Sequence, residues 1–132
     1  RVYEAQPVGL AWQPVFLNLA CRLGTTLPPH ELLSACQEIE AGLGRRNTTR
    51  NGPRIIDIDI LLYDSLVLND SDLVIPHPRL AERAFVLVPL AEIAPDTIEP
   101  RTGVTIHELL EQCPDSHWVR PYSGGPYVPS VR

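Results

Sequence analysis

Two carboxylates, Asp57 and Asp59, stand two residues apart in an aliphatic run that directly follows Arg54. The β-branched, uninterrupted apolar pattern of this run predicts a buried strand. Side chains alternate faces along a strand, so both carboxylates would point the same way, roughly 6.6 Å apart along the backbone. Burial and mutual repulsion penalise two unpaired like charges, so we expect a cation between them. A divalent ion that bridges phosphates fits this pair; the alternative is neutralisation by nearby arginines.

Arginines are concentrated just ahead of this run, where Arg45, Arg46, Arg50 and Arg54 lie on a polar loop. A charged loop of this kind is commonly only a solvated surface. Beside a metal site, however, guanidinium groups suit a polyphosphate, whose charge needs neutralising on several oxygens. The loop therefore favours a phosphate ligand over a purely structural role for the aspartates.

A second basic group follows the aspartates, where His77 lies between two prolines and is followed by Arg79 and Arg83. A lone histidine is more often structural than catalytic, but these neighbours make His77 a candidate donor to phosphate. The sequence has no glycine-rich phosphate loop, no Gly-x-Ser-x-Gly and no histidine pair spaced for zinc. Phosphate binding would therefore rest on side chains and metal.

The composition is that of an ordinary globular domain, with 44% hydrophobic residues, 20% charged residues and a net charge of −5 in 132 residues. We expect one domain over residues 1–132, with 121–132 as a loose tail. The negative charge argues against a nucleic-acid partner, and no apolar run is long enough for a membrane span. Cys21, Cys36 and Cys113 lack metal-ligand spacing and are typical of small buried residues in a reducing compartment, which indicates a cytoplasmic protein.

The elements that would position these residues alternate between strand and helix. In chain order we expect a strand at 15–23, a helix at 30–43, a strand at 55–63, extended pieces at 66–68 and 73–75, a helical turn at 80–83, a strand at 85–90 and a helix from the capping box Thr105-x-x-Glu108 to about 112. The first helix would bury four residues at helical spacing: Leu32, Cys36, Ile39 and Leu43. This order lacks the regular βα alternation of a Rossmann fold, so we expect the α+β class, a mostly antiparallel sheet with helices packed against it.

Two segments resemble the 6-hydroxymethyl-7,8-dihydropterin pyrophosphokinases of folate biosynthesis. They read Gly52-Pro-Arg-x-x-Asp-x-Asp59 and Ile75-Pro-His-Pro-Arg-Leu-x-Glu-Arg-Ala-Phe-Val-Leu-x-Pro-Leu-x-Glu-Ile-Ala-Pro95, and the resemblance extends back to about Tyr3. It implies a ferredoxin-like fold and an ATP-dependent pyrophosphokinase that transfers pyrophosphate to the pterin and releases AMP. It also implies a strand and a long helix ahead of Arg1, so we expect that the sequence given lacks this N-terminal part of the family domain.

The resemblance also implies a role for each matching position. The metal ligands would be Asp57 and Asp59, holding two Mg²⁺ ions that bridge the ATP phosphates, and Arg45 and Arg54 would complete the catalytic group. The implied ATP-binding residues are Leu33, Gln37, Arg45, Arg50, Arg54, Ile60, His77 and Arg83. The implied pterin-binding residues are Pro7, Val8, Phe16, Asn18 and Phe85. Among these, the two phenylalanines would stack on opposite faces of the pterin ring, and the Asn18 amide would read its edge.

The implied partners are two small molecules, ATP as co-substrate and 6-hydroxymethyl-7,8-dihydropterin, with neither nucleic acid nor membrane. Two other classes share parts of the pattern. A polymerase-β-type nucleotidyltransferase also binds Mg²⁺ with an Asp-x-Asp strand, but it requires a Gly-Ser turn that Gly44-Arg45 does not supply. A degenerate, non-catalytic relative would keep the fold and bind pterin or nucleotide only. The retained arginines, the aspartates and His77 favour an active enzyme.

Overall fold

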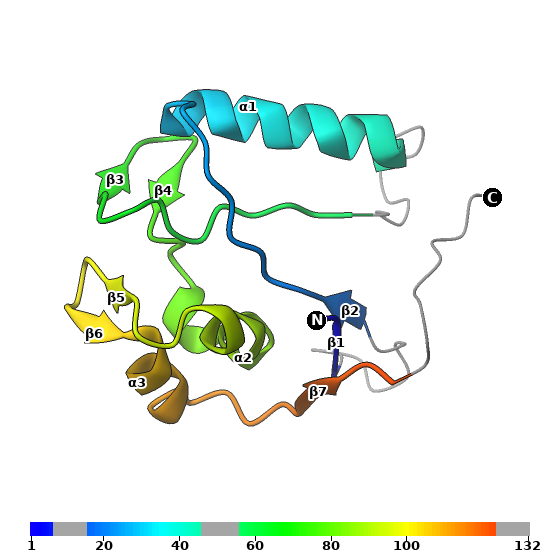
Figure 1. Cartoon of the computed structure of the whole chain (residues 1–132), viewed down its shortest axis with the longest axis vertical. Coiled ribbons are helices and arrows are strands. Elements are labelled where there is room, and N and C mark those ends of the chain that lie inside the picture. The colour runs from blue at the N-terminus through cyan, green and yellow to red at the C-terminus, as the bar shows by residue number, and fades with distance from the viewer. Residues whose placement is uncertain (7–15, 46–55, 124–132) are drawn as a thin grey trace.

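The computed structural model describes residues 1–6, 16–45 and 56–123 of the chain. Its elements, in chain order, are β1 (Tyr3–Ala5), β2 (Phe16–Asn18), α1 (Pro29–Glu40), η1 (Ala41–Arg45), β3 (Leu68–Asn69), β4 (Val74–Ile75), η2 (Leu80–Glu82), α2 (Ala84–Ile93), β5 (Ile98–Glu99), β6 (Val104–Thr105), α3 (Ile106–Glu111) and β7 (Val119–Pro121). Helices combine with antiparallel strand pairs, which confirms the α+β class (Figure 1). Within these ranges no helix combines the length and the apolar character that crossing a membrane requires.

The largest sheet has three short strands in the order β2-β1-β7, so β1 is central and pairs antiparallel with both neighbours. This pairing joins the beginning of the chain to its late segment. The predicted loose tail is wrong at its start, because Pro121 belongs to β7 and Tyr122 donates its backbone N–H to the carbonyl of Val2 at 2.9 Å. Residues 124–132 lie outside the described residues.

The apolar core lies where α2 packs against α3. Its buried members are Leu80, Leu87, Leu90, Ala94, Ile106 and Leu109. Removing a side chain such as Leu87 from water contributes about 1.5–3 kcal/mol, so this cluster supplies a large share of the folding free energy. The capping box predicted for the last helix is confirmed. The Thr105 hydroxyl accepts the Glu108 backbone N–H at 3.1 Å, and the Glu108 carboxylate accepts the Thr105 backbone N–H at 3.1 Å.

One of the two short hairpins and a short helical turn were predicted from the sequence, and the second hairpin, β5 with β6, was not. Strands β3 and β4 pair around the polar turn that follows Asn69, as the two extended pieces indicated. The helical turn expected at 80–83 is confirmed as η2. Strands β5 and β6 pair through a turn in which Gly103 has a φ of 77°, a conformation that favours glycine.

The apolar run at 85–90 forms most of helix α2, so the strand predicted there is wrong. Six successive apolar residues fit a buried strand and a buried helix equally well, because neither has a polar face to set a period. Packing against α3 selects the helix. Pro89 lies in the interior of α2 and has no N–H to donate to the carbonyl four residues earlier, which belongs to Phe85.

The aspartate-bearing segment, residues 56–63, is extended and runs along α1, but it is in none of the sheets of the described chain (Figure 1). Its backbone bonds run instead from the N–H of Ile58 to the Glu40 side chain and from the His77 N–H to the carbonyl of Leu61. The predicted alternation holds, since the isoleucines are half-buried between exposed aspartates. The prediction of a buried strand is wrong, because side-chain and loop groups replace the ladder.

Two further elements are shorter than predicted. Of the strand expected at 15–23, only Phe16–Asn18 forms β2, and position 15 lies outside the described residues. The residues after β2 pair with no described strand, so Leu19 and Leu23 are more than half exposed. Cys21, which we expected to be buried, is exposed.

Helix α1 turns a different face inward from the one predicted. It ends at Glu40 and continues as the π-helical segment η1, so its α-helical part stops short of residue 43. Cys36 is buried as predicted, but Ile39 and Leu43 are exposed and Glu40 is buried in their place. The bond from Glu40 to Ile58 explains the rotation, because it draws a polar side chain to the inner face.

Candidate active site

A pocket of about 350 Å³ lies between α1, the aspartate-bearing segment and the residues that lead into α2. Its lining is Leu33, Gln37, Glu40, Asp57, Ile58, Asp59, His77 and Arg83. Six of these residues were predicted as site residues from the sequence. The structure therefore brings both predicted metal ligands and four predicted ATP-site residues together from three separate parts of the chain.

Glu40 holds the backbone between the two aspartates. Its side chain, in a residue only 5% exposed, accepts the N–H of Ile58 at 2.7 Å. Because side chains alternate along extended backbone, this bond leaves Asp57 and Asp59 on the same side of the segment. Glu40 was not among the residues predicted for the site, although it lies four residues after Cys36 and so on the same helix face. A carboxylate at a buried helix position needs hydrogen-bond partners, and that was the available signal.

His77 reaches the pocket in a defined tautomer. Its Nδ1 accepts the backbone N–H of Arg79 at 3.2 Å, so the proton of the neutral ring lies on Nε2. Burial lowers the pKa of His77 below its usual 6.5, and Arg83 and Arg79 add to this against the opposing effect of Asp59. The ring is therefore neutral at pH 7 and has an Nε2–H available as a donor.

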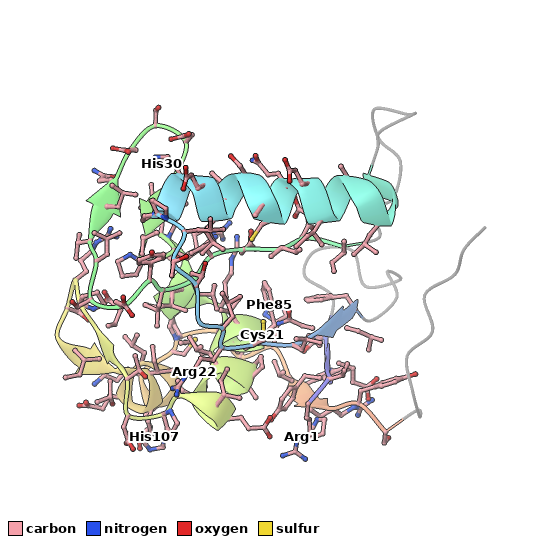
Figure 2. The ribbon with its side chains drawn as sticks, turned by 45° about the horizontal axis from the view of Figure 1, so that its top comes forward. Arg1, Cys21, Arg22, His30, Phe85 and His107 are labelled. Carbon is pink, nitrogen blue, oxygen red and sulfur yellow. The ribbon has the colours of Figure 1, made fainter. Side chains whose placement is uncertain are left out.

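Arg83 connects this pocket to a pair of aromatic rings. Its guanidinium carbon lies 5.6 Å from the ring centroid of Phe85, within the range of a cation–π contact. Phe85 in turn meets Phe16 edge to face, with centroids 5.1 Å apart and ring planes at 86°. The side-chain N–H of Asn18 donates to the backbone carbonyl of Phe85. Three predicted pterin-site residues therefore lie together, in the middle of the molecule, where Figure 2 labels Phe85.

The two phenylalanines do not form a slot in this structure. A flat heterocycle held between parallel rings needs them about 7 Å apart, twice the ~3.5 Å contact distance between carbon atoms. The observed edge-to-face contact leaves no such space, so stacking on both faces requires one ring to turn and the pair to separate. Among the other predicted residues, Ile60 does not line the pocket. Pro7, Val8, Arg50 and Arg54 lie outside the described residues, and of Arg45 only the backbone is described, at the end of η1.

A second group of possible metal ligands lies at the N-terminal end of α1. The Nε2 of His30 is 3.0 Å from an Asp70 oxygen and 3.4 Å from an Asp72 oxygen (Figure 2). All three residues are exposed, and their ligand atoms lie within 4.8 Å of one another. This cluster shares no residue with the pocket, so it serves below as a matched control for Asp59.

Comparison with known proteins is consistent with these groupings. A family model described as 7,8-dihydro-6-hydroxymethylpterin-pyrophosphokinase matches residues 1–95. The chain is 51% identical over 108 residues to the 2-amino-4-hydroxy-6-hydroxymethyldihydropteridine pyrophosphokinase of Methylorubrum extorquens, covering 82% of this chain and 67% of that protein. It is 45% identical over 113 residues to the protein of the same name from Pseudomonas aeruginosa, covering 86% of this chain and 69% of that one.

Longer proteins match as well. A folic acid synthesis protein of Dictyostelium discoideum is 45% identical over 114 residues, which is 86% of this chain but only 17% of that protein. The chain thus spans a small part of this relative and about two thirds of the two bacterial proteins. The match covers both the aspartate-bearing segment and the stretch from His77 to Phe85. The chain belongs to the 7,8-dihydro-6-hydroxymethylpterin-pyrophosphokinase family.

Proposed function

We propose that this chain transfers pyrophosphate from ATP to 6-hydroxymethyl-7,8-dihydropterin, giving AMP and the dihydropterin diphosphate, as a step of folate biosynthesis. One observation carries the proposal: a single pocket is lined by paired carboxylates, a neutral histidine and an arginine, and that arginine contacts one ring of an aromatic pair. The pocket suits a polyphosphate, and the aromatic pair suits a flat ring. Their adjacency is what a transfer between ATP and a pterin requires.

Two Mg²⁺ ions fit Asp57 and Asp59 in this proposal. The carboxylates are exposed, lie on one side of the segment and border a pocket large enough for phosphate groups. Magnesium in proteins commonly takes one or two carboxylates together with substrate phosphates. When bound, the ions would neutralise charge on the polyphosphate. His77 would donate its Nε2–H to a phosphate oxygen, and Arg83 would offer its planar fork to two oxygens.

The pterin would bind beside Phe16 and Phe85. One ring would turn to admit the heterocycle, and the Asn18 carbonyl and second amide N–H would read its edge. The hydroxymethyl oxygen would attack the β-phosphorus in line, and the bond from that phosphorus to the α,β-bridging oxygen would break. AMP would leave with the bridging oxygen, and the hydroxyl proton would pass to solvent. Arg45 and Arg54 are proposed to stabilise charge during this transfer.

The proposed partners are therefore the two small-molecule substrates, and the proposed compartment is the cytoplasm. Cys21, Cys36 and Cys113 are free thiols, as a reducing compartment maintains them. A phosphate ligand would also account for the four arginines between positions 45 and 54 in a chain of negative net charge.

Product analysis tests the proposal. The chain is incubated with ATP, Mg²⁺ and 6-hydroxymethyl-7,8-dihydropterin, and nucleotides are separated by anion-exchange chromatography. We expect AMP in amounts equal to the pterin diphosphate, and none when the pterin is omitted. Release of inorganic pyrophosphate instead would indicate a nucleotidyltransferase. Binding of both substrates without any AMP would indicate a non-catalytic relative.

A further inference from the structure

The first turn of α2 lies at the junction of the two proposed binding sites. Arg83, immediately before the helix, lines the pocket, and Phe85, its second residue, contacts Phe16. The direction of this turn therefore decides where a phosphate donor and an aromatic face lie relative to each other. Two residues outside the pocket act on it, Pro89 and Asp115.

Pro89 acts through its missing backbone N–H, which leaves one hydrogen bond of α2 unmade. In an uninterrupted α-helix the N–H of residue 89 would donate to the carbonyl of Phe85, and proline has no N–H. The Phe85 carbonyl accepts the side-chain N–H of Asn18 instead. The bond is partly buried, where a carbonyl without a partner is costly, so the missing helix bond and the Asn18 bond are complementary. The Asn18 amide is thereby oriented by α2, and its second N–H and its carbonyl have a defined direction.

Asp115 acts on the other side of the same turn. Arg83 occupies the N-cap position of α2 but makes no side-chain cap. The cap comes from Asp115, 31 residues after Ala84, whose Oδ2 accepts the Ala84 N–H at 2.9 Å. Its Oδ1 accepts the backbone N–H of His117 at 3.0 Å, and the Asp115 side chain is only 11% exposed. A carboxylate at this helix end also interacts favourably with the helix dipole.

The carboxylate is ionised in this setting. Burial opposes ionisation, but the N–H groups of His117 and Ala84 outweigh it and hold the pKa of Asp115 below its usual 3.8. Asp115 lies after residue 95, where the family-model match ends, and no pattern in the sequence connects it to α2. Its effect on the site is visible only from the fold.

We propose that Pro89 and Asp115 are positioning residues for pterin binding, which hold Phe85 and Asn18 in register through the Phe85 carbonyl and the Ala84 N–H. The proposal rests on the proposed function for its ligand. It differs from a purely structural role because Pro89 weakens its own helix: proline in a helix interior costs roughly 3 kcal/mol relative to alanine. A residue whose role was only to stabilise the fold would not lower the stability of its own helix.

Pro89→Ala gives the sharpest test. Alanine restores the N–H, which should take the Phe85 carbonyl and displace Asn18. We expect unchanged or higher resistance to urea, together with a loss of about tenfold in pterin affinity, the size that one hydrogen bond commonly corresponds to. Isothermal titration with 6-hydroxymethyl-7,8-dihydropterin, in the presence of Mg²⁺ and α,β-methylene-ATP, measures this. Affinity for the ATP analogue itself should stay within about twofold.

Asp115→Ala is the second variant, and Thr105→Ala is its matched control because it removes the cap of α3, which carries no proposed site residue. Both should lower stability by a similar amount, but only Asp115→Ala should weaken pterin binding. Wild-type pterin affinity in Pro89→Ala, or an equal loss of pterin affinity in both cap variants at equal folded fraction, would overturn the proposal.

If the wild-type chain binds no pterin, the proposed function fails. NMR of the ligand-free protein then tests the positioning role separately. The side-chain amide resonances of Asn18 should shift in Pro89→Ala, and unchanged resonances would overturn the positioning role.

Discussion

The half of the molecule built on α2 and α3 differs in kind from the half built on α1 and residues 56–63. In the first, Leu87 and Ile106 are completely buried and α3 has a full capping box. In the second, α1 buries only Cys36 and Glu40, and the extended segment beside it has no strand partner among the described residues. The first half is stabilised by apolar packing, and the second holds exposed carboxylates.

The site lies where these halves meet. Arg83 and Phe85 come from the packed half, and Asp57 and Asp59 come from the open half. Rigid elements can hold an aromatic face and a phosphate donor in fixed positions, whereas charged ligands for an ion must stay accessible to water and substrate. Substitutions in the two halves should therefore separate stability from activity.

The largest effect should follow Asp59→Ala in the open half. Loss of a metal ligand should reduce turnover by at least about 100-fold, while the free energy of unfolding changes by less than about 0.5 kcal/mol because Asp59 is exposed. AMP release and urea unfolding measure the two quantities. Asp72→Ala, in the exposed cluster with His30, is the matched control and should keep full turnover. Activity of Asp59→Ala within threefold of wild type would contradict the metal assignment.

The opposite result is expected for Ile106→Ala in the packed half. Its side chain is fully buried, so the substitution should lower the free energy of unfolding by about 2–5 kcal/mol through lost burial and a residual cavity. Turnover per folded molecule should not change, because Ile106 does not line the pocket. Urea unfolding with a parallel active-fraction measurement checks both statements. A drop in turnover that persists after correction for unfolding would show that the two halves are coupled.

Phe85→Ala and Phe16→Ala test the aromatic pair that lies where the two halves meet. Each should weaken pterin binding by about tenfold, because each removes an aromatic contact worth on the order of 1 kcal/mol beyond its buried area. ATP binding should change much less, although Phe85→Ala also removes the contact of Arg83 with the ring. Titration with each ligand separately measures the affinity for pterin and the affinity for ATP. Equal losses for both ligands would point to general damage at the junction instead of a pterin site.

The smallest effect concerns pH and His77. Its pKa is lowered in the folded protein, mainly by burial, so the unfolded chain binds a proton more readily. The stabilising contribution of the neutral ring should therefore be complete above about pH 6.5 and decline as pH falls through the folded-state pKa. Urea midpoints at pH 7.5 and 5.5 should differ less in His77→Gln than in the wild type. Identical pH dependence in both proteins would rule out this contribution.

Local chemistry predicted a good part of this fold. The turn after Asn69, the capping box at Thr105 and the alternation around Asp57 and Asp59 each depend on residues a few positions apart, so the sequence alone determined them. The family resemblance predicted further site residues, and six of the predicted residues line one pocket. The predicted roles of the site residues stay predictions, and several of these residues lie outside the described ranges.

What the sequence could not determine depends on partners far along the chain. The run 85–90 has no period of its own, and α3, more than ten residues later, makes it a helix. Glu40 is buried because it meets the N–H of Ile58, and the first turn of α2 is held by Asn18 and Asp115, which lie 67 and 31 residues from their bonding partners. A polar group can be buried only where a specific partner satisfies it, and the partner is chosen by the tertiary structure. The sequence alone therefore determined which residues we propose for the chemistry, and only the tertiary structure decided what holds them in place.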